Sequence, residues 1–165
     1  MFELQPLSPQ AIDSALEKAE RYRLLNEPWE ADSICRDILA VDENNQRAVT
    51  ILLLALTDRF AGEGVSVKEV REVADRLESE YERAYYNGII CERRGKSRLA
   101  SNVMGTGPAV YDWLRDAMDW FEKAKELRPA GNDDAILRWN TCARLIMRHK
   151  DVRPAPAERV ETMLE

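Results

Sequence analysis

The side chains best suited to catalysis are few and widely separated in this sequence. His149 is the only histidine, and the three cysteines, Cys35, Cys91 and Cys142, lack the ligand spacing of a zinc site. A thiol hydrolase would need a fold that joins Cys91 to His149. We instead expect Cys91 to be a buried structural thiol and His149 to end a helix, where the helix dipole favours its charged form. The sequence therefore predicts no catalytic residue, no metal and no cofactor.

The string Gly95-Lys96-Ser97 invites comparison with a phosphate-binding loop. Such a loop has a further glycine separated by four residues from the Gly-Lys pair, so that backbone amides can surround a phosphate. Position 90 is isoleucine, and the residues before Gly95 have the pattern of a helix rather than of a strand and loop. We therefore exclude a nucleotide site of this kind.

Four basic residues, Arg93, Arg94, Lys96 and Arg98, lie just before and at the start of the segment 95–108, GKSRLASNVMGTGP, and form its basic flank. They are suited to bind an acidic peptide, a phosphate or RNA. An equally simple interpretation is that the arginines complement the negative C-terminal end of their helix and keep the surface soluble. Both interpretations remain open at the level of the sequence.

Composition limits the classes of function. The chain has 165 residues, of which 45% are hydrophobic, and a net charge of −6, as expected for one soluble domain. The net charge argues against a general nucleic-acid binder or a binder of anionic membranes. The charge is uneven: residues 1–82 hold 9 basic and 18 acidic side chains (−9), and residues 83–165 hold 15 and 12 (+3).

Targeting signals are not evident in the sequence. No stretch approaches the roughly 20 apolar residues of a membrane span, and the start, MFELQPLSPQ, does not have the pattern of a secretory signal. Three separated cysteines fit reduced thiols better than a disulfide framework. We therefore expect a cytoplasmic protein that does not interact with membranes.

Helix signals recur along the chain, whereas strand signals are nearly absent. Ser66 and Ser79 each precede a glutamate by three residues, which is the spacing of a capping box. Together with the apolar positions that recur at helical spacing, these caps predict an all-α fold. The helices are expected near residues 9–26, 29–41, 45–60, 67–78, 80–95, 108–127 and 133–149.

One stretch has a pattern found in repeat proteins. Ala117-x3-Phe121-x2-Ala124-x4-Pro129 resembles the second helix of a tetratricopeptide (TPR) repeat, with small residues for close packing, an aromatic residue for the groove between helices and a proline after the helix. An earlier stretch, residues 31–39, has a similar layout.

Spacing supports the resemblance. The contact position of each first helix falls at Ala19, Leu53, Gly88 and Trp139, in steps of 34, 35 and 51 residues, against a family period of 34. The 17 extra residues fall between the two helices of the third unit, which predicts an inserted loop near 95–108.

The TPR resemblance implies antiparallel helix pairs stacked as a short right-handed α-α superhelix of about seven helices. We expect a single repeat domain over residues 1–150 and a flexible C-terminal tail over residues 151–165, with a short amphipathic turn through Val160, Met163 and Leu164. The ends of such a stack can also pair with another copy, giving a homo-oligomer.

The same resemblance implies a non-enzymatic scaffold or adaptor that binds a protein or peptide in the concave groove lined by first helices, assisted by the inserted loop. The alternative is a binder of an anionic ligand or RNA through Arg93–Arg98. The groove positions that the resemblance implies are Asp13, Leu16, Glu20, Arg23, Arg47, Thr50, Leu54, Thr57, Glu82, Tyr85, Ile89 and Glu92. The candidate partner-binding residues are Arg23, Arg47, Leu54, Tyr85, Ile89, Glu92, Arg93, Arg94, Lys96 and Arg98.

Overall fold

Polar caps and prolines begin the helices of this chain. The side chains of Asn45, Ser66 and Ser79 each accept a hydrogen bond from the backbone N–H three residues further along, which satisfies a donor that the helix itself leaves unpaired. The computed structural model describes residues 1–62 and 64–156. It has a 3-10 helix, η1 (Pro9–Ala11), followed by α1 (Ile12–Leu24), α2 (Pro28–Val41), α3 (Gln46–Asp58), α4 (Val67–Ala74), α5 (Glu80–Ala100), α6 (Gly107–Leu127) and α7 (Asp134–Arg148).

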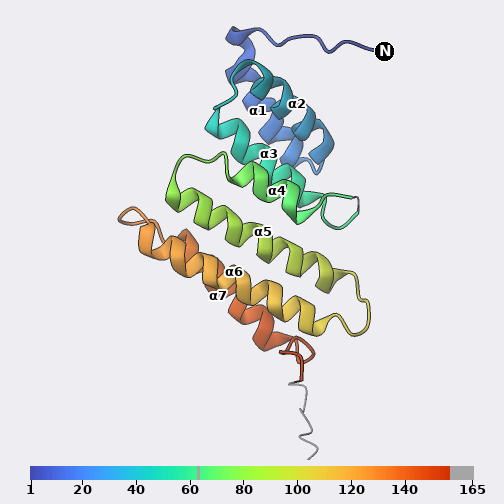
Figure 1. Cartoon of the computed structure of the whole chain (residues 1–165), viewed down its shortest axis with the longest axis vertical. Helices are drawn as coiled ribbons and strands as arrows, with labels where there is room; N and C mark the ends of the chain where they lie inside the picture. The colour runs from blue at the N-terminus through green and yellow to red at the C-terminus, as the bar shows by residue number, and fades with distance from the viewer. Residues whose placement is uncertain (63, 157–165) are drawn as a thin grey trace, which may run out of the picture.

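The helices form a stack along the long axis of the molecule, from α1 and α2 at one end to α6 and α7 at the other (Figure 1). Each helix packs against the helix that follows it, and α1 and α5 both also contact α3. Seven α-helices and no strand occur within the described ranges, so the prediction of an all-α fold of about seven helices is confirmed.

Two clusters of apolar side chains form the core. The first joins α1 to α4 and includes Ile90 of α5, and the second joins α5, α6 and α7. The half-buried Leu54 and Tyr86 contact both clusters, so the core continues along the stack. Phe121 is one of the largest fully buried side chains of the second cluster. Burying one such side chain stabilises the fold by about 1.5–3 kcal/mol.

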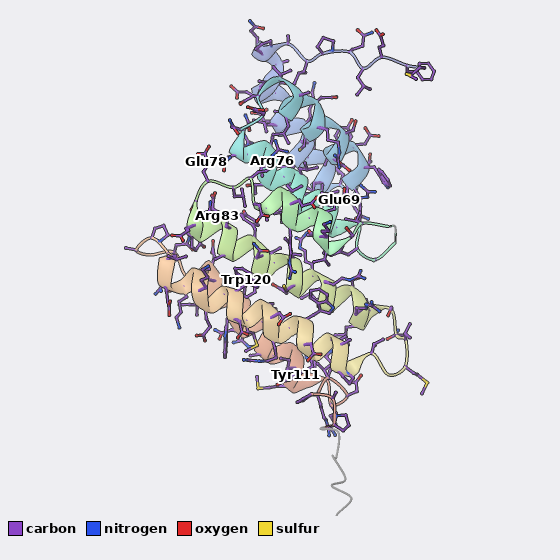
Figure 2. All side chains as sticks on the ribbon, viewed as in Figure 1. Glu69, Arg76, Glu78, Arg83, Tyr111 and Trp120 are labelled. Atoms are coloured by element: carbon purple, nitrogen blue, oxygen red, sulfur yellow. The ribbon has the colours of Figure 1, made fainter. Side chains whose placement is uncertain are left out.

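Hydrogen bonds from side chains fasten the connection between α4 and α5 to its neighbours. The Arg83 guanidinium donates to the carbonyls of Leu77 (2.6 Å) and Glu78 (2.9 Å), and the Gln46 carboxamide accepts from the Glu78 N–H (2.8 Å). Figure 2 labels Glu78 and Arg83 at this turn. The contacts fix the N-terminal ends of α3 and α5 relative to each other.

The loop between α5 and α6 is shorter than the sequence predicts. Residues 95–100 belong to α5 and Gly107-Pro108 begins α6, so the connection is 101–106. A Cβ at Gly95 would lie 3.3 Å from the Leu114 side chain, which shows that the missing side chain allows α6 to approach α5 closely. Much of the predicted insertion therefore lengthens the two helices, each of which has 21 residues.

The packed part of the chain extends two residues beyond the predicted boundary at residue 150. Val152 is 2% exposed within the second core cluster, and its N–H donates to the His149 carbonyl (3.1 Å). The Asp151 carbonyl lies against Gly107, where no side chain would fit. The predicted amphipathic turn through Val160, Met163 and Leu164 lies outside the described residues.

Helices long and apolar enough to cross a bilayer are not found in residues 1–62 and 64–156.

Candidate functional site

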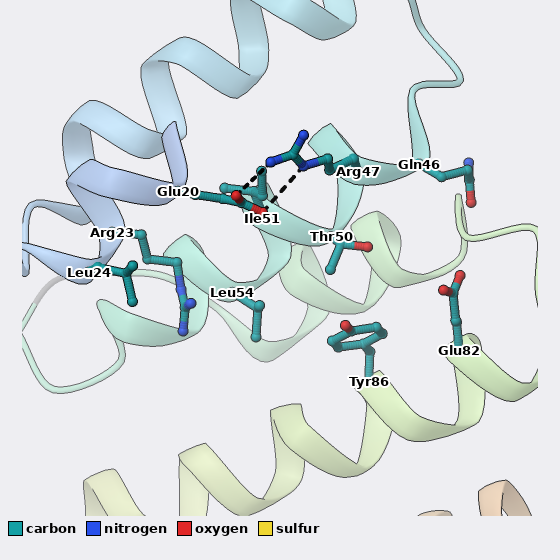
Figure 3. Close-up of a pocket in the computed structure, with 10 residues that line it drawn as sticks. All are labelled: Glu20, Arg23, Leu24, Gln46, Arg47, Thr50, Ile51, Leu54, Glu82 and Tyr86. Carbon is teal, nitrogen blue, oxygen red and sulfur yellow. Dashed lines mark hydrogen bonds and ion pairs between the residues drawn. The ribbon is translucent and has the colours of Figure 1, made fainter. Parts of the chain in front are cut away.

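A groove of about 610 Å³ lies between α1, α3 and α5 (Figure 3). Each helix contributes residues spaced three or four apart, because such residues share one face of a helix. The groove combines apolar and charged side chains from all three helices. The lining residues are Glu20, Arg23, Leu24, Gln46, Arg47, Thr50, Ile51, Leu54, Glu82 and Tyr86.

An ion pair connects α1 to α3 along the groove. Arg47 donates from Nη2 to Glu20 Oε2 (2.6 Å) and from Nε to Glu20 Oε1 (3.3 Å), as the dashed lines of Figure 3 show. Both side chains are about half exposed, and exposed pairs contribute roughly 0–1 kcal/mol. The pair therefore orients two groove residues more than it stabilises the fold.

A second set of charges links α1, α3 and α5 through Asp58. Its carboxylate lies 2.8 Å from Arg23 Nε and 2.5 Å from Arg93 Nη1. Arg93 Nη1 also donates to Thr57 Oγ1 (2.7 Å) and to the carbonyl of Leu54 (3.3 Å), a groove residue. Burial lowers the pKa of Arg93, and the Asp58 charge opposes this shift. We name these residues the Asp58 triad: Arg23, Asp58 and Arg93.

A third set of charges links α5 to α7 through Glu92, whose side chain is fully buried. Its Oε1 accepts from Lys96 and from Arg138 Nη1 (3.4 Å), whereas Oε2 has no hydrogen-bond donor among the described residues. A buried carboxylate requires cations nearby, because it has lost its hydration. We name these residues the Glu92 triad: Glu92, Lys96 and Arg138.

The thiols are not arranged for nucleophilic chemistry. Cys35, Cys91 and Cys142 are buried, and desolvation raises the pKa of Cys35 and of Cys142 to about 12. Burial also raises the pKa of Cys91, partly offset by a contact from Arg71 Nη2 at 3.6 Å. Three or more His, Cys, Asp or Glu side chains grouped as metal ligands do not occur in the described part of the chain.

Six of the residues that the resemblance predicts for the groove line it: Glu20, Arg23, Arg47, Thr50, Leu54 and Glu82. Leu16 and Thr57 are buried instead, and Asp13 does not line the groove. Tyr85 does not line it, because its ring packs on Phe121 of α6, with centroids 5.9 Å apart.

Two further groove candidates are enclosed within the structure. Ile89 is buried in the second core cluster, and Glu92 is buried within its triad. Tyr86, one position after Tyr85, lines the groove instead. Of the predicted residues of α5, Glu82 lines the groove, and Tyr86 lines it in place of Tyr85.

Sequence reasoning also missed four groove residues that come from positions adjacent to predicted ones. Leu24 follows Arg23, and Ile51 lies between the candidates at positions 50 and 54. Their apolar character was a signal for the groove, but the same character is typical of core residues. The four missed residues are Leu24, Gln46, Ile51 and Tyr86.

The basic flank does not form one patch. Arg93 and Lys96 belong to the two triads, whereas Arg94 lies over the Phe60 ring, 5.7 Å from its centroid. Arg98 is exposed near the end of α5, and neither Arg94 nor Arg98 forms an ion pair within residues 1–62 and 64–156. The structure therefore divides the four predicted cations between different environments.

No family model matches this sequence, and no curated protein or solved structure is significantly similar to it.

Proposed function

We propose that this protein is a non-enzymatic scaffold or adaptor that binds a peptide segment of a partner protein in the groove between α1, α3 and α5. The observation that carries the proposal is the groove itself, which three helices build together. Leu24, Leu54 and Tyr86 supply apolar surface for side chains of a peptide, and the charged residues around them supply specificity.

A TPR-like arrangement of the helix pairs, with the right-handed superhelix that it implies, is part of this proposal. Support comes from the contact positions that the repeat spacing predicts. Ala19 and Leu53 are fully buried, and Gly88 lies so close to Phe121 that an added Cβ would be 2.5 Å from the ring. The contacts of α1 and α5 with α3 fit the same arrangement.

The proposed absence of catalysis is supported by the burial of all three thiols and by their raised pKa values. A nucleophilic cysteine needs the opposite shift and an accessible sulfur. Free thiols also fit the proposed cytoplasmic location, because disulfides are rare in a reducing compartment.

Selection from a random 12-residue peptide library displayed on phage, with the full chain as bait, tests the proposal. Thr50→Trp fills the groove from α3, and Glu72→Trp introduces the same side chain on α4, which does not line the groove. We expect the selected peptides to bind the native chain and Glu72→Trp equally and Thr50→Trp at least 10-fold more weakly. Equal binding to all three proteins would refute binding in the groove.

A further inference from the structure

The Asp58 and Glu92 triads lie next to each other on adjacent residues of α5. Glu92 and Arg93 are consecutive, so the two triads share one helical turn. Arg23 and Arg93 both contact the Asp58 carboxylate, and Lys96 and Arg138 both contact the Glu92 carboxylate. Six residues from four helices thus form one group, which we name the ion cluster: Arg23, Asp58, Glu92, Arg93, Lys96 and Arg138.

The ion cluster has more positive than negative charge. It contains four cations and two carboxylates, and each carboxylate already lies between two cations. The cationic side chains are between 22% and 39% exposed, so they have lost much of their hydration and still remain accessible. A surplus of partly desolvated positive charge costs free energy, and an incoming anion lowers that cost.

The cluster adjoins apolar surface of the groove. Arg23 lines the groove together with Leu24, whose side chain is 81% exposed at the end of α1. Leu54 and Tyr86 lie in the same groove, and the Leu54 carbonyl accepts from Arg93. An anion bound at the cluster would therefore have apolar surface beside it, which suits a peptide that carries both kinds of side chain.

We infer that the groove takes an acidic peptide, with an Asp or Glu side chain beside Arg23 and Arg93 and a large apolar neighbour on Leu24, Leu54 and Tyr86. This inference rests on the proposed function and names the chemistry of the partner. Charge complementarity carries it, because the four cations of the ion cluster share only two carboxylates. Of the carboxylates that line the groove, Glu20 already pairs with Arg47, and Glu82 forms no ion pair within the described residues. The apolar surface beside the cluster favours a peptide over a purely anionic ligand.

The same phage selection tests the inference when the enriched sequences are compared with the unselected library. We expect enrichment of sequences with an Asp or Glu adjacent to Leu, Ile, Phe or Met, and a negative mean net charge. The most enriched sequence that contains Glu beside an apolar residue is then synthesised with a fluorescein label, together with a version in which this Glu is replaced by Gln. Fluorescence anisotropy at 50 and 300 mM NaCl gives Kd for each, and we expect the Gln version to bind about 10-fold more weakly at 50 mM.

Charge-matched variants of the protein assign the effect to the ion cluster. Lys96→Gln and Arg138→Gln each remove one positive charge from a half-exposed member, whereas Arg94→Gln removes the same charge from the same region of α5 outside the cluster. We expect the first two variants to weaken binding 5- to 10-fold and Arg94→Gln to change it less than 2-fold. Thermal unfolding of each variant verifies that it is folded.

The outcomes separate this inference from the proposed function. Some peptides could lose binding to Thr50→Trp but show no enrichment of Asp or Glu, or bind Lys96→Gln and Arg138→Gln as well as the native chain. Either result would overturn the inference and leave the proposed function intact. Peptides that bind Thr50→Trp as well as the native chain would overturn both. Acidic peptides that are lost in Thr50→Trp, Lys96→Gln and Arg138→Gln would support both.

Discussion

The Arg93 guanidinium on α5 lies 2.5 Å from the Asp58 carboxylate on α3, across 35 residues of sequence. The same carboxylate lies 2.8 Å from Arg23 on α1, so one acidic side chain connects the three helices that build the groove. Its removal leaves two arginines less than one-quarter exposed and without this partner. Asp58 is therefore expected to stabilise the fold and to position groove residues.

Asp58→Asn is expected to lower the free energy of unfolding by about 2 kcal/mol, because an unpaired and partly buried cation is costly. Urea unfolding followed by circular dichroism measures this change. A double-mutant cycle with Arg93→Gln is expected to give a coupling energy above roughly 0.5 kcal/mol, as for residues in one network. Purely additive effects would show that the pair contributes nothing.

Gly88→Ala is expected to destabilise the protein by about 1–3 kcal/mol, although alanine favours helices. The added Cβ would lie 2.5 Å from Phe121 Cε1, so the fully buried ring would have to move. Gly95→Ala is the control in the same helix, since its Cβ would lie 3.3 Å from the Leu114 and Trp113 side chains. Equal stability of the two variants would argue against the close contact between α5 and α6.

Helix positions were predictable because their signals are local. Ser66 and Ser79 cap α4 and α5 as their spacing predicts, and each accepts the expected hydrogen bond at 3.1 and 3.3 Å. The end of α5 was not predictable in the same way. Gly95 resembles a helix terminator, but it remains helical because Leu114 and Trp113 of α6 pack against it.

The groove was predictable in location and less so in residues. The TPR resemblance implies six of the residues that line the groove, whereas on α5 it implies Tyr85 where Tyr86 lines the groove. Tyr85 instead packs on Phe121 of α6, a contact that no local pattern specifies. The partner of Glu92 on α7 is 46 residues away, so the ion cluster emerges only from the tertiary structure.

Stability is expected to fall as the pH rises above about 9. Burial raises the pKa of Cys35 and of Cys142 from the ordinary value of 9.0 to about 12. Above pH 9 the unfolded chain loses these protons while the folded chain retains them, so the folded state binds more protons and is disfavoured as pH increases. Each thiol contributes a slope that approaches about 1.4 kcal/mol per pH unit.

Urea unfolding between pH 8 and 10 measures this slope. Burial also raises the pKa of Tyr86, from the ordinary value of 10.0 to about 12, so this tyrosine adds to the slope mainly above pH 10. The double variant Cys35→Ala/Cys142→Ala provides the control, because it removes both thiols. Its slope above pH 9 should be shallower than that of the native chain. Identical slopes would mean that the thiols are not protected in the folded state.

Val152→Ala is expected to lower the free energy of unfolding by about 1–2 kcal/mol, because it removes two buried methyl groups. Val103→Ala in the loop between α5 and α6 is the matched control, since Val103 is 60% exposed and its change should stay within about 0.5 kcal/mol. A Val152→Ala effect as small as that of the control would contradict packing beyond residue 150.

Binding of RNA through Arg93–Arg98 is expected to be weak, because Arg93 and Lys96 are already ion-paired within the protein. We expect fluorescence anisotropy with a labelled 20-nucleotide polyuridine to show no binding at micromolar protein concentration and 150 mM NaCl. Salt-sensitive binding that is lost in Arg94→Ala/Arg98→Ala would instead favour the anion-binding alternative.

Chemical-shift mapping by NMR tests the central claim most directly. A peptide obtained from the phage selection is titrated into isotope-labelled protein, and the perturbed amide and methyl signals are assigned to helices. We predict that the largest shifts occur at Leu24, Thr50, Ile51, Leu54 and Tyr86, which line the groove. Shifts confined to the loop 101–106 or to α6 and α7 would contradict binding between α1, α3 and α5.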